Sequence, residues 1–169
     1  ELAYEIHVPN QSLMAAYTAL RNAGETHGMS FFGSRAVEAM RLEMGFMHWK
    51  SELITEFSPY ETGLERFVMM DKAFIGKEAL IAHEPKVQLV SLTLETKEAP
   101  AHGGASVMLD GRVVGTVTTG AWGHRVGANI ALAFVERGLA QEGQSLSVDV
   151  LGKVVQATVA PMRRLEGAH

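Results

Sequence analysis

The fold is decided by the stretch SVMLDGRVVGTV, residues 106–117. Its two apolar-rich halves flank Asp110-Gly111, and this dipeptide between two strand-like runs is a strong signal for a tight β-hairpin. Further runs typical of strands lie at 87–95, 129–135, 146–151 and 154–159. Short strands separated by Gly-rich turns predict a small antiparallel β-barrel after Pro85.

The residues before Pro85 show a different pattern. Residues 3–8 alternate in polarity as a half-buried strand does. Helical spacing predicts helices over 10–24 and 34–44, and the aromatic-containing stretch 46–58 predicts an ordered loop of the kind that is usually functional. A strand at 66–70 and a short helix at 77–83 follow. We therefore predict an α+β chain: a partial α/β domain at 1–84, with a strand, two helices and a further strand, and then a small antiparallel β-barrel at 85–169.

Composition and charge exclude several function classes. The 169 residues carry a formal net charge of −4, so no basic excess indicates nucleic acid or an anionic membrane as a partner. The absence of cysteine excludes disulfides, thiolate zinc sites and a Cys nucleophile within this chain. No apolar run approaches the ~20 residues that cross a bilayer, and no signal peptide is recognised. We expect a cytoplasmic protein that binds a small molecule.

Seven segments occur in an order that resembles one family. They are ELAYEIHVP (1–9), MRLEMG (40–45), SPYETGL (58–64), FIGKEAL (74–80), DGRVVG (110–115), TTG (118–120) and IALAFV (130–135). Together they resemble the glycine-cleavage T-protein (aminomethyltransferase) family over nearly the whole chain. Arg35-Ala36 ahead of Arg41-Leu42-Glu43, and Trp122-Gly123-His124 in the barrel, are closer to the sarcosine and dimethylglycine dehydrogenase branch. The resemblance implies that 1–84 is the C-terminal portion of the folate-binding domain and 85–169 the C-terminal barrel domain.

The resemblance also implies an activity. Enzymes of this branch oxidise an N-methyl amine at FAD and pass the one-carbon unit to tetrahydrofolate. This chain would be the C-terminal folate-binding part of such an enzyme, with FAD in upstream domains and a small N-methyl amine as substrate. The family's catalytic aspartate belongs to an earlier segment, so we expect no catalytic residue here and no activity from this chain alone.

Two other functions stay open. The first is a stand-alone aminomethyltransferase, or a related folate-dependent demethylase, without flavin. The second, of another class, is a non-catalytic folate-binding or docking module. A flavin-binding GxGxxG segment upstream would favour the fusion enzyme over the first alternative.

Glu5 and Tyr4 are candidate folate-binding residues on the opening segment. The family uses a glutamate at the position of Glu5 to hold the pterin ring, and a carboxylate can accept two neighbouring N–H groups at once. The other interpretation of Glu5 is a solvated strand carboxylate. Tyr4 points to the opposite face by strand alternation, so it is the weaker candidate.

Trp49 and Arg35 are the other two candidates. Trp49 follows the RLE helix where the family has an aromatic residue, and its flat ring suits stacking on a pterin or aminobenzoyl group; the other interpretation is a hydrophobic lid over the helix. The glycine-cleavage branch binds the folate tail with an arginine at the position of Val37. Arg35 could reach the same carboxylates, although two helical residues are ~200° of rotation apart.

The remaining polar residues have simpler interpretations. Arg41 and Glu43 are expected to be structural, in an ion pair or helix-end contacts. The histidines lack metal-ligand spacing and HExxH is absent, so no metal site is expected. His124 in a Gly-rich loop is interpreted as a surface residue, and the methionines as core filler.

Overall fold

The chain divides into two compact units, Glu1–Gly33 and Ser34–His169. A computed structural model describes residues 2–165 of them. The first unit contains a 3-10 helix, η1 (Asn10–Ser12), and helix α1 (Leu13–Glu25). The ring of Tyr17 on α1 stacks on Phe31 with 5.6 Å between centroids. Apolar side chains of α1 are nevertheless exposed, including Leu13, Met14 and Leu20.

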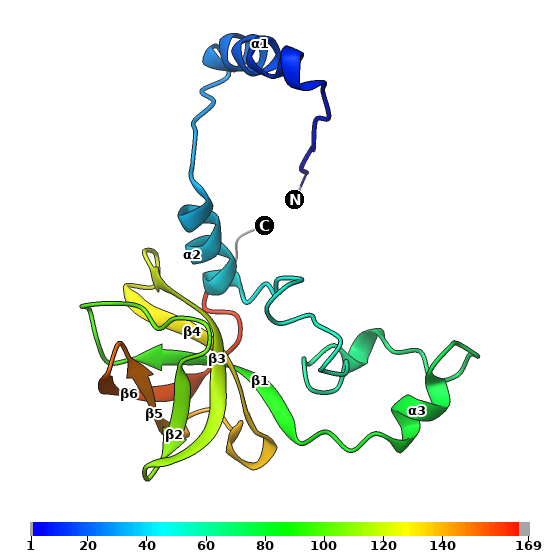
Figure 1. Cartoon of the computed structure of the whole chain (residues 1–169), viewed down its shortest axis with the longest axis vertical. Coiled ribbons are helices and arrows are strands. Elements are labelled where there is room, and N and C mark those ends of the chain that lie inside the picture. The colour runs from blue at the N-terminus through cyan, green and yellow to red at the C-terminus, as the bar shows by residue number, and fades with distance from the viewer. Residues whose placement is uncertain (1, 166–169) are drawn as a thin grey trace. The chain divides into compact units, whose positions relative to one another are not determined.

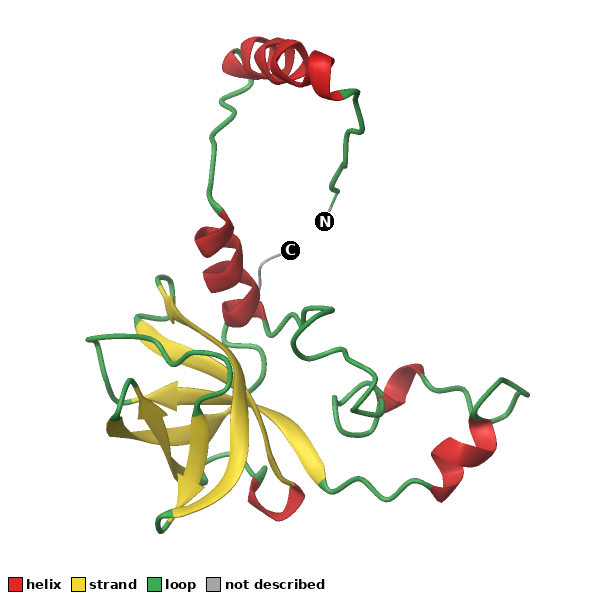
Figure 2. Ribbon diagram, in the orientation of Figure 1, coloured by secondary structure: helices red, strands yellow, loops and turns green. Residues whose placement is uncertain are grey.

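The second unit is built on a closed six-stranded barrel (Figures 1 and 2). Its strands are β1 (Val87–Leu94), β2 (Ser106–Leu109), β3 (Arg112–Gly123), β4 (Ala128–Glu136), β5 (Ser145–Val150) and β6 (Lys153–Ala160). They pair antiparallel in the order β1-β4-β3-β2-β5-β6, and β6 pairs again with β1. The other elements are α2 (Ser34–Met44), η2 (Glu65–Phe67), α3 (Lys77–Ala82) and η3 (Arg137–Leu139). Helix α2 packs against β3 and β4.

Strand β4 is buried on both of its faces. Alternate residues of a strand point to opposite sides. Ala131, Ala133 and Val135 face the barrel core, whereas the larger Ile130, Leu132 and Phe134 join a second cluster with Leu42 of α2. Small residues on the inside and large ones on the outside let one strand serve the barrel interior and the α2 contact together.

The barrel predicted from the sequence is confirmed, and so is the α+β class. The turn of the 106–117 hairpin has positive φ at both Asp110 (50°) and Gly111 (79°), as a type I′ turn requires. All six strands form close to their predicted limits, and β3 runs on to Gly123. The helices at 34–44 and 77–82 also match the prediction.

Two strands predicted in the N-terminal part are wrong. Residues 2–8 form no strand, and 66–70 begins inside the 3-10 helix η2 and continues without regular structure. Polarity alternation indicates a strand only if a neighbouring edge can pair with it. Every strand among residues 2–165 belongs to the closed barrel, and none of them pairs with residues 2–8 or 66–70.

Gly45 ends α2 for a geometrical reason. Its φ is +70°, a conformation that residues with a Cβ adopt at a cost. A Cβ at this position would also lie 2.6 Å from the carbonyl oxygen of Met162. Gly45 therefore allows the C-terminal segment to cross directly over the end of α2.

We predict that Gly45→Ala lowers the free energy of unfolding by about 3 kcal/mol, because backbone strain and overpacking add. Gly127→Ala is the matched control: its φ is +71° and no atom lies within 4 Å of the added Cβ, so only the strain of about 1 kcal/mol should remain. Urea unfolding measures both. Equal losses in the two variants would contradict the close approach of Met162.

Candidate functional site

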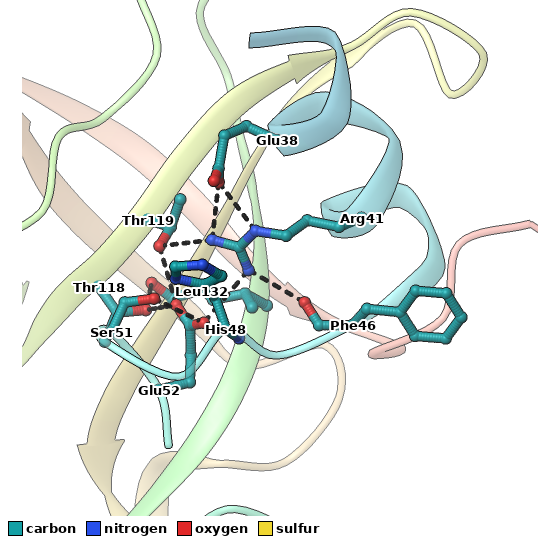
Figure 3. Close-up of polar contacts among 9 residues, drawn as sticks. All are labelled: Glu38, Arg41, Phe46, His48, Ser51, Glu52, Thr118, Thr119 and Leu132. Atoms are coloured by element: carbon teal, nitrogen blue, oxygen red, sulfur yellow. Dashed lines mark hydrogen bonds and ion pairs between the residues drawn. The ribbon is translucent and has the colours of Figure 1, made fainter. Parts of the chain in front are cut away.

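A buried ion pair joins the end of α2 to the following loop and to β3. Only 9% of the Arg41 side chain and none of the Glu52 side chain is exposed. Their charged groups lie 3.2 Å apart. Figure 3 shows Arg41 reaching from α2 towards Glu52 and the two threonines of β3. Because a buried charge is costly unless every polar atom is bonded, the partners of this pair decide whether it is stable.

The Glu52 carboxylate accepts five hydrogen bonds. The donors are Arg41 Nη1 (3.2 Å), the His48 backbone N–H (2.8 Å), Ser51 Oγ (2.9 Å), Thr118 Oγ1 (2.6 Å) and Thr119 Oγ1 (2.8 Å). The first three reach Oε2 and the two threonines reach Oε1. Both oxygens are thus saturated by donors that favour the ionised form. We call Glu52, Arg41 and these partners the Glu52 network.

A β-bulge brings both threonines to the same carboxylate. Neighbouring residues of a regular strand point to opposite faces, so Thr118 and Thr119 could not normally share one partner. In the β3–β4 pairing, Val117 faces Ala133 and Thr119 faces Leu132, which leaves Thr118 as the extra residue. A bulge redirects the side chains around it. Here it points two hydroxyl groups towards Glu52.

Arg41 uses its whole guanidinium group in the same network. Its Nε donates to Glu38 (2.8 Å), its Nη1 also donates to the Phe46 carbonyl (3.0 Å), and its Nη2 donates to Thr119 (3.0 Å) and approaches Glu38 (2.7 Å). The planar fork of arginine suits such divergent contacts better than a lysine would. The structural role expected for Arg41 is confirmed.

Glu43 is also structural, as expected. Its buried carboxylate accepts the backbone N–H of Arg125 (2.6 Å) and of Val126 (3.3 Å), in the loop between β3 and β4. Its carbonyl accepts the N–H of Arg164 (2.9 Å). Arg41 and Glu43 therefore attach two sides of α2 to the barrel.

The network keeps Glu52 ionised. Burial by itself raises the pKa of a carboxyl group, and this is the largest effect on Glu52. Hydrogen bonds from Thr118, the His48 N–H, Thr119 and Ser51 together outweigh burial and lower the pKa of Glu52 below its ordinary value. The carboxylate is therefore an acceptor at neutral pH and not a proton donor.

Of the predicted folate residues, Trp49 lies next to this network. It stands between His48 and Ser51, both of which bond to Glu52, and 75% of Trp49 is exposed. Such exposure is not that of a hydrophobic lid over α2, so that interpretation is wrong for this chain. Arg35 is an exposed residue of α2. Val37, at the position of the family's arginine, is 42% exposed.

Tyr4 and Glu5 lie in the first unit. Tyr4 is 80% exposed. The Glu5 side chain is 91% exposed and lies 3.7 Å from the imidazole of His7. Both functional groups are accessible to a ligand, and the roles given to Tyr4, Glu5, Arg35 and Trp49 stay predictions.

The same loop also lines a cavity of about 790 Å³. Phe46, Met47 and Leu53 line it together with Arg66 and Arg163. Its size would suit a small organic molecule. None of the four predicted folate residues lines it, so it is not part of the predicted folate contacts.

The sequence did not single out Glu52, and it singled out Thr118 and Thr119 only as part of the TTG segment of the family resemblance. No local signal distinguished Glu52, because the loop 46–58 contains a second acidic residue, Glu56, and several other polar residues. The pairing with Thr118 and Thr119, 66 and 67 residues further along the chain, depends on a bulge that no local pattern marks.

Two kinds of feature are not found among the residues described. No three His, Cys, Asp or Glu side chains within 2–165 come together as metal ligands. In the same part of the chain, each helix is too short or too polar to cross a bilayer.

Two family models match successive parts of the chain. Residues 1–72 match the GCVT N-terminal domain, and residues 88–164 match the glycine cleavage T-protein C-terminal barrel domain. A solved structure of the glycine cleavage system aminomethyltransferase T from Bartonella henselae superposes with a TM-score of 0.82 at 22% identity, over 91% of this chain and 45% of that one. This likeness supports the fold.

Curated relatives include enzymes of two kinds. Human mitochondrial dimethylglycine dehydrogenase is 37% identical over 94% of this chain and 19% of its own length. The aminomethyltransferase of Saccharopolyspora erythraea is 33% identical over 96% of this chain and 46% of its own length. Mouse mitochondrial sarcosine dehydrogenase is 34% identical over 80% of this chain and 15% of its own length. The chain thus spans less than half the length of each of these relatives.

The lowered pKa of Glu52 leads to a prediction about acid stability. Since the folded-state pKa lies below the unfolded-state value, the carboxylate stabilises the fold above that value, and its contribution is lost as the pH falls through the folded-state pKa. We predict that Glu52→Gln costs about 3 kcal/mol of unfolding free energy at neutral pH. The difference from the unsubstituted chain should shrink once the pH falls below 4.5, the ordinary value.

Urea unfolding at a series of pH values tests this. Glu98→Gln is the control, because Glu98 is an exposed carboxylate paired with Lys153 on the barrel surface. It should cost little at any pH. A Glu52→Gln loss that stays constant from neutral to acid pH would show that the charge of Glu52 is unimportant.

Proposed function

This chain belongs to the glycine cleavage T-protein family, and we propose that it is the C-terminal folate-binding part of a tetrahydrofolate-dependent one-carbon-transfer enzyme. The proposed parent is an N-demethylating oxidoreductase of the sarcosine or dimethylglycine dehydrogenase type. Its substrate would be a small N-methyl amine. Its other domains would carry FAD. Within the chain, we propose 1–84 as part of the folate-binding domain and 85–169 as the barrel domain.

The observation that carries this proposal is the match of both family models in the family's own order. The family identified from seven short motifs is thereby confirmed. The dehydrogenase branch is favoured by the 37% identity with a dimethylglycine dehydrogenase, against 33% for an aminomethyltransferase. The names of the dehydrogenase relatives include a mitochondrial location. Our expectation of a cytoplasmic protein remains a proposal for this chain.

The chemistry of the four predicted residues fits a folate. Glu5 offers an exposed carboxylate for the N–H donors along one edge of a pterin. Trp49 and Tyr4 offer exposed rings that can stack on its flat groups. Arg35 offers an exposed guanidinium for the carboxylates of the glutamate tail. The buried carboxylate of Glu52 takes no part in these proposed contacts, because each of its oxygens already accepts hydrogen bonds within the chain.

In this proposal, the chain binds and orients and does not itself react. Tetrahydrofolate supplies two nitrogens that accept the one-carbon unit. Glu5 orients the pterin, Trp49 restricts the ring to one plane and Arg35 fixes the tail, so that the reacting nitrogens are held in place. The barrel supplies the rigid body to which the loop of Trp49 is attached through Glu52 and β3.

A second candidate is a stand-alone aminomethyltransferase without flavin. It is supported by the 33% identity with the Saccharopolyspora erythraea aminomethyltransferase over 96% of this chain. Sequencing the gene upstream separates the two, because only the fusion enzyme needs a flavin-binding domain. A non-catalytic folate-binding or docking module is the third candidate, and folate affinity separates docking alone from the other functions.

We predict that Glu5→Gln in the full-length protein weakens binding of folinic acid, a stable reduced folate, by about tenfold or more, because a charged hydrogen-bond acceptor is lost. Isothermal titration calorimetry measures the affinity. Glu25→Gln, a change of another exposed glutamate of the first unit, should leave it unchanged. Equal affinity in Glu5→Gln and the unsubstituted protein would remove Glu5 from the site.

We also predict that this chain alone neither oxidises sarcosine or dimethylglycine nor transfers a one-carbon unit to tetrahydrofolate. The reason is that the proposed flavin site and the family's catalytic aspartate lie elsewhere. Amine-dependent dye reduction and formation of methylene-tetrahydrofolate are the two assays, with the full-length protein as the positive control. Turnover by the isolated chain in either assay would contradict the division of labour proposed here.

A further inference from the structure

Trp49 is carried by a turn whose two ends are bonded to one buried carboxylate. On one side, the backbone N–H of His48 donates to Glu52 Oε2 (2.8 Å), and on the other, Ser51 Oγ donates to the same oxygen (2.9 Å). The carbonyl of His48 also accepts the N–H groups of Ser51, Glu52 and Leu53, at 3.3, 3.1 and 3.1 Å. The turn is therefore closed around Trp49 by its own backbone and by Glu52.

The Glu52 network also fixes that turn to the barrel. Oε1 of Glu52 accepts the hydroxyls of Thr118 and Thr119 on β3, and Arg41 of α2 completes the set. Figure 3 shows these groups gathered around Glu52, with His48 and Ser51 beside it. The turn is thus attached to a rigid strand and a helix, whereas 75% of Trp49 itself is exposed.

An exposed indole on a rigid turn has a defined use. A large flat ring that is already held in place loses less conformational freedom when a ligand stacks on it. Precise sites are made by rigid supports behind the contacting residue. A carboxylate with five donors is a more demanding arrangement than is needed to bury a loop, because an apolar residue of the same size would fill the space without a desolvation cost.

We propose that Glu52 is a positioning residue, which holds the Trp49 ring ready to stack on a flat aromatic heterocycle. The identity of the heterocycle, a pterin or aminobenzoyl group of folate, rests on the proposed function. The positioning itself rests on the contacts of Glu52. Glu52 does not contact the ligand; it acts through His48, Ser51 and the turn between them.

The test uses a full-length protein that carries Trp122→Phe, so that Trp49 is the one tryptophan left among the 169 residues of this part. Any tryptophan in the other domains is replaced as well. Three further variants are compared in this background: Glu52→Gln, Ser51→Ala and the surface control Glu98→Gln. The decay of tryptophan fluorescence anisotropy reports the motion of the Trp49 ring. Titration calorimetry with folinic acid reports affinity.

We expect Glu52→Gln to increase the motion of Trp49 and to weaken folinic acid binding by about tenfold, with a smaller loss of about threefold for Ser51→Ala and none for Glu98→Gln. The double variant Trp49→Leu/Glu52→Gln should bind folinic acid as weakly as Trp49→Leu alone. Both substitutions remove the same contact, the stacking of the Trp49 ring, so their effects should not add. Ser51→Ala keeps the test decisive if Glu52→Gln does not fold, since it removes a single bond.

Unchanged Trp49 motion and affinity in both Glu52→Gln and Ser51→Ala, with only the unfolding free energy reduced, would overturn the inference and leave Glu52 as a stabilising residue. Additive losses in the double variant would do the same. If the unsubstituted protein does not bind folinic acid, the proposed function fails, and the anisotropy measurements still decide whether Glu52 positions the ring.

Discussion

The saturation of the Glu52 carboxylate is the constraint on which the second unit depends. A fully buried charge without partners would cost more than a small domain can tolerate. Its partners come from three places, Arg41 on α2, His48 and Ser51 on the loop, and Thr118 and Thr119 on β3. Helix, loop and barrel must all be in their native positions for the charge to be satisfied. One carboxylate therefore couples α2 and the loop that follows it to a strand whose threonines begin 66 residues further along the chain.

The barrel provides the other half of this coupling. β1 and β6 pair over Ser91–Leu94 and close the barrel, and the N-terminal half of β1 accepts a loop instead, since the N–H of Leu89 donates to the carbonyl of Glu61 (2.7 Å). The outward residues of β4 and Leu42 supply the apolar part of the coupling, and the rings of Phe57 and Phe134 stack at 3.6 Å. The bulge at Thr118 supplies the polar part. Apolar burial holds the loop against the barrel, and the Glu52 network fixes the position of the loop along β3.

Local signals were enough to predict the barrel but not the network. The Asp110-Gly111 turn and the regular spacing of short apolar runs are properties of neighbouring residues, and they located all six strands. Residues 3–8 show why the same reasoning failed elsewhere: alternation says which face a strand would bury, not whether a partner strand exists. The role of Glu52 was not predicted for a related reason. Its partners Thr118 and Thr119 lie on a distant strand, and an irregularity in the strand pairing turns their side chains towards it.

The same contrast explains why the predicted ligand residues and the stabilising residues are separate sets. Tyr4, Glu5 and Trp49 are exposed, and they were identified because they lie in or next to segments that resemble the family's motifs. Glu52 is buried and belongs to none of the family segments, yet it lies three residues from Trp49 in a closed turn. An exposed ring gives a site its contacts, and a buried charge gives it a fixed geometry. In the folate site that we propose, loss of Glu52 would keep every proposed contacting side chain and would remove the arrangement proposed to hold Trp49 ready for a flat ring.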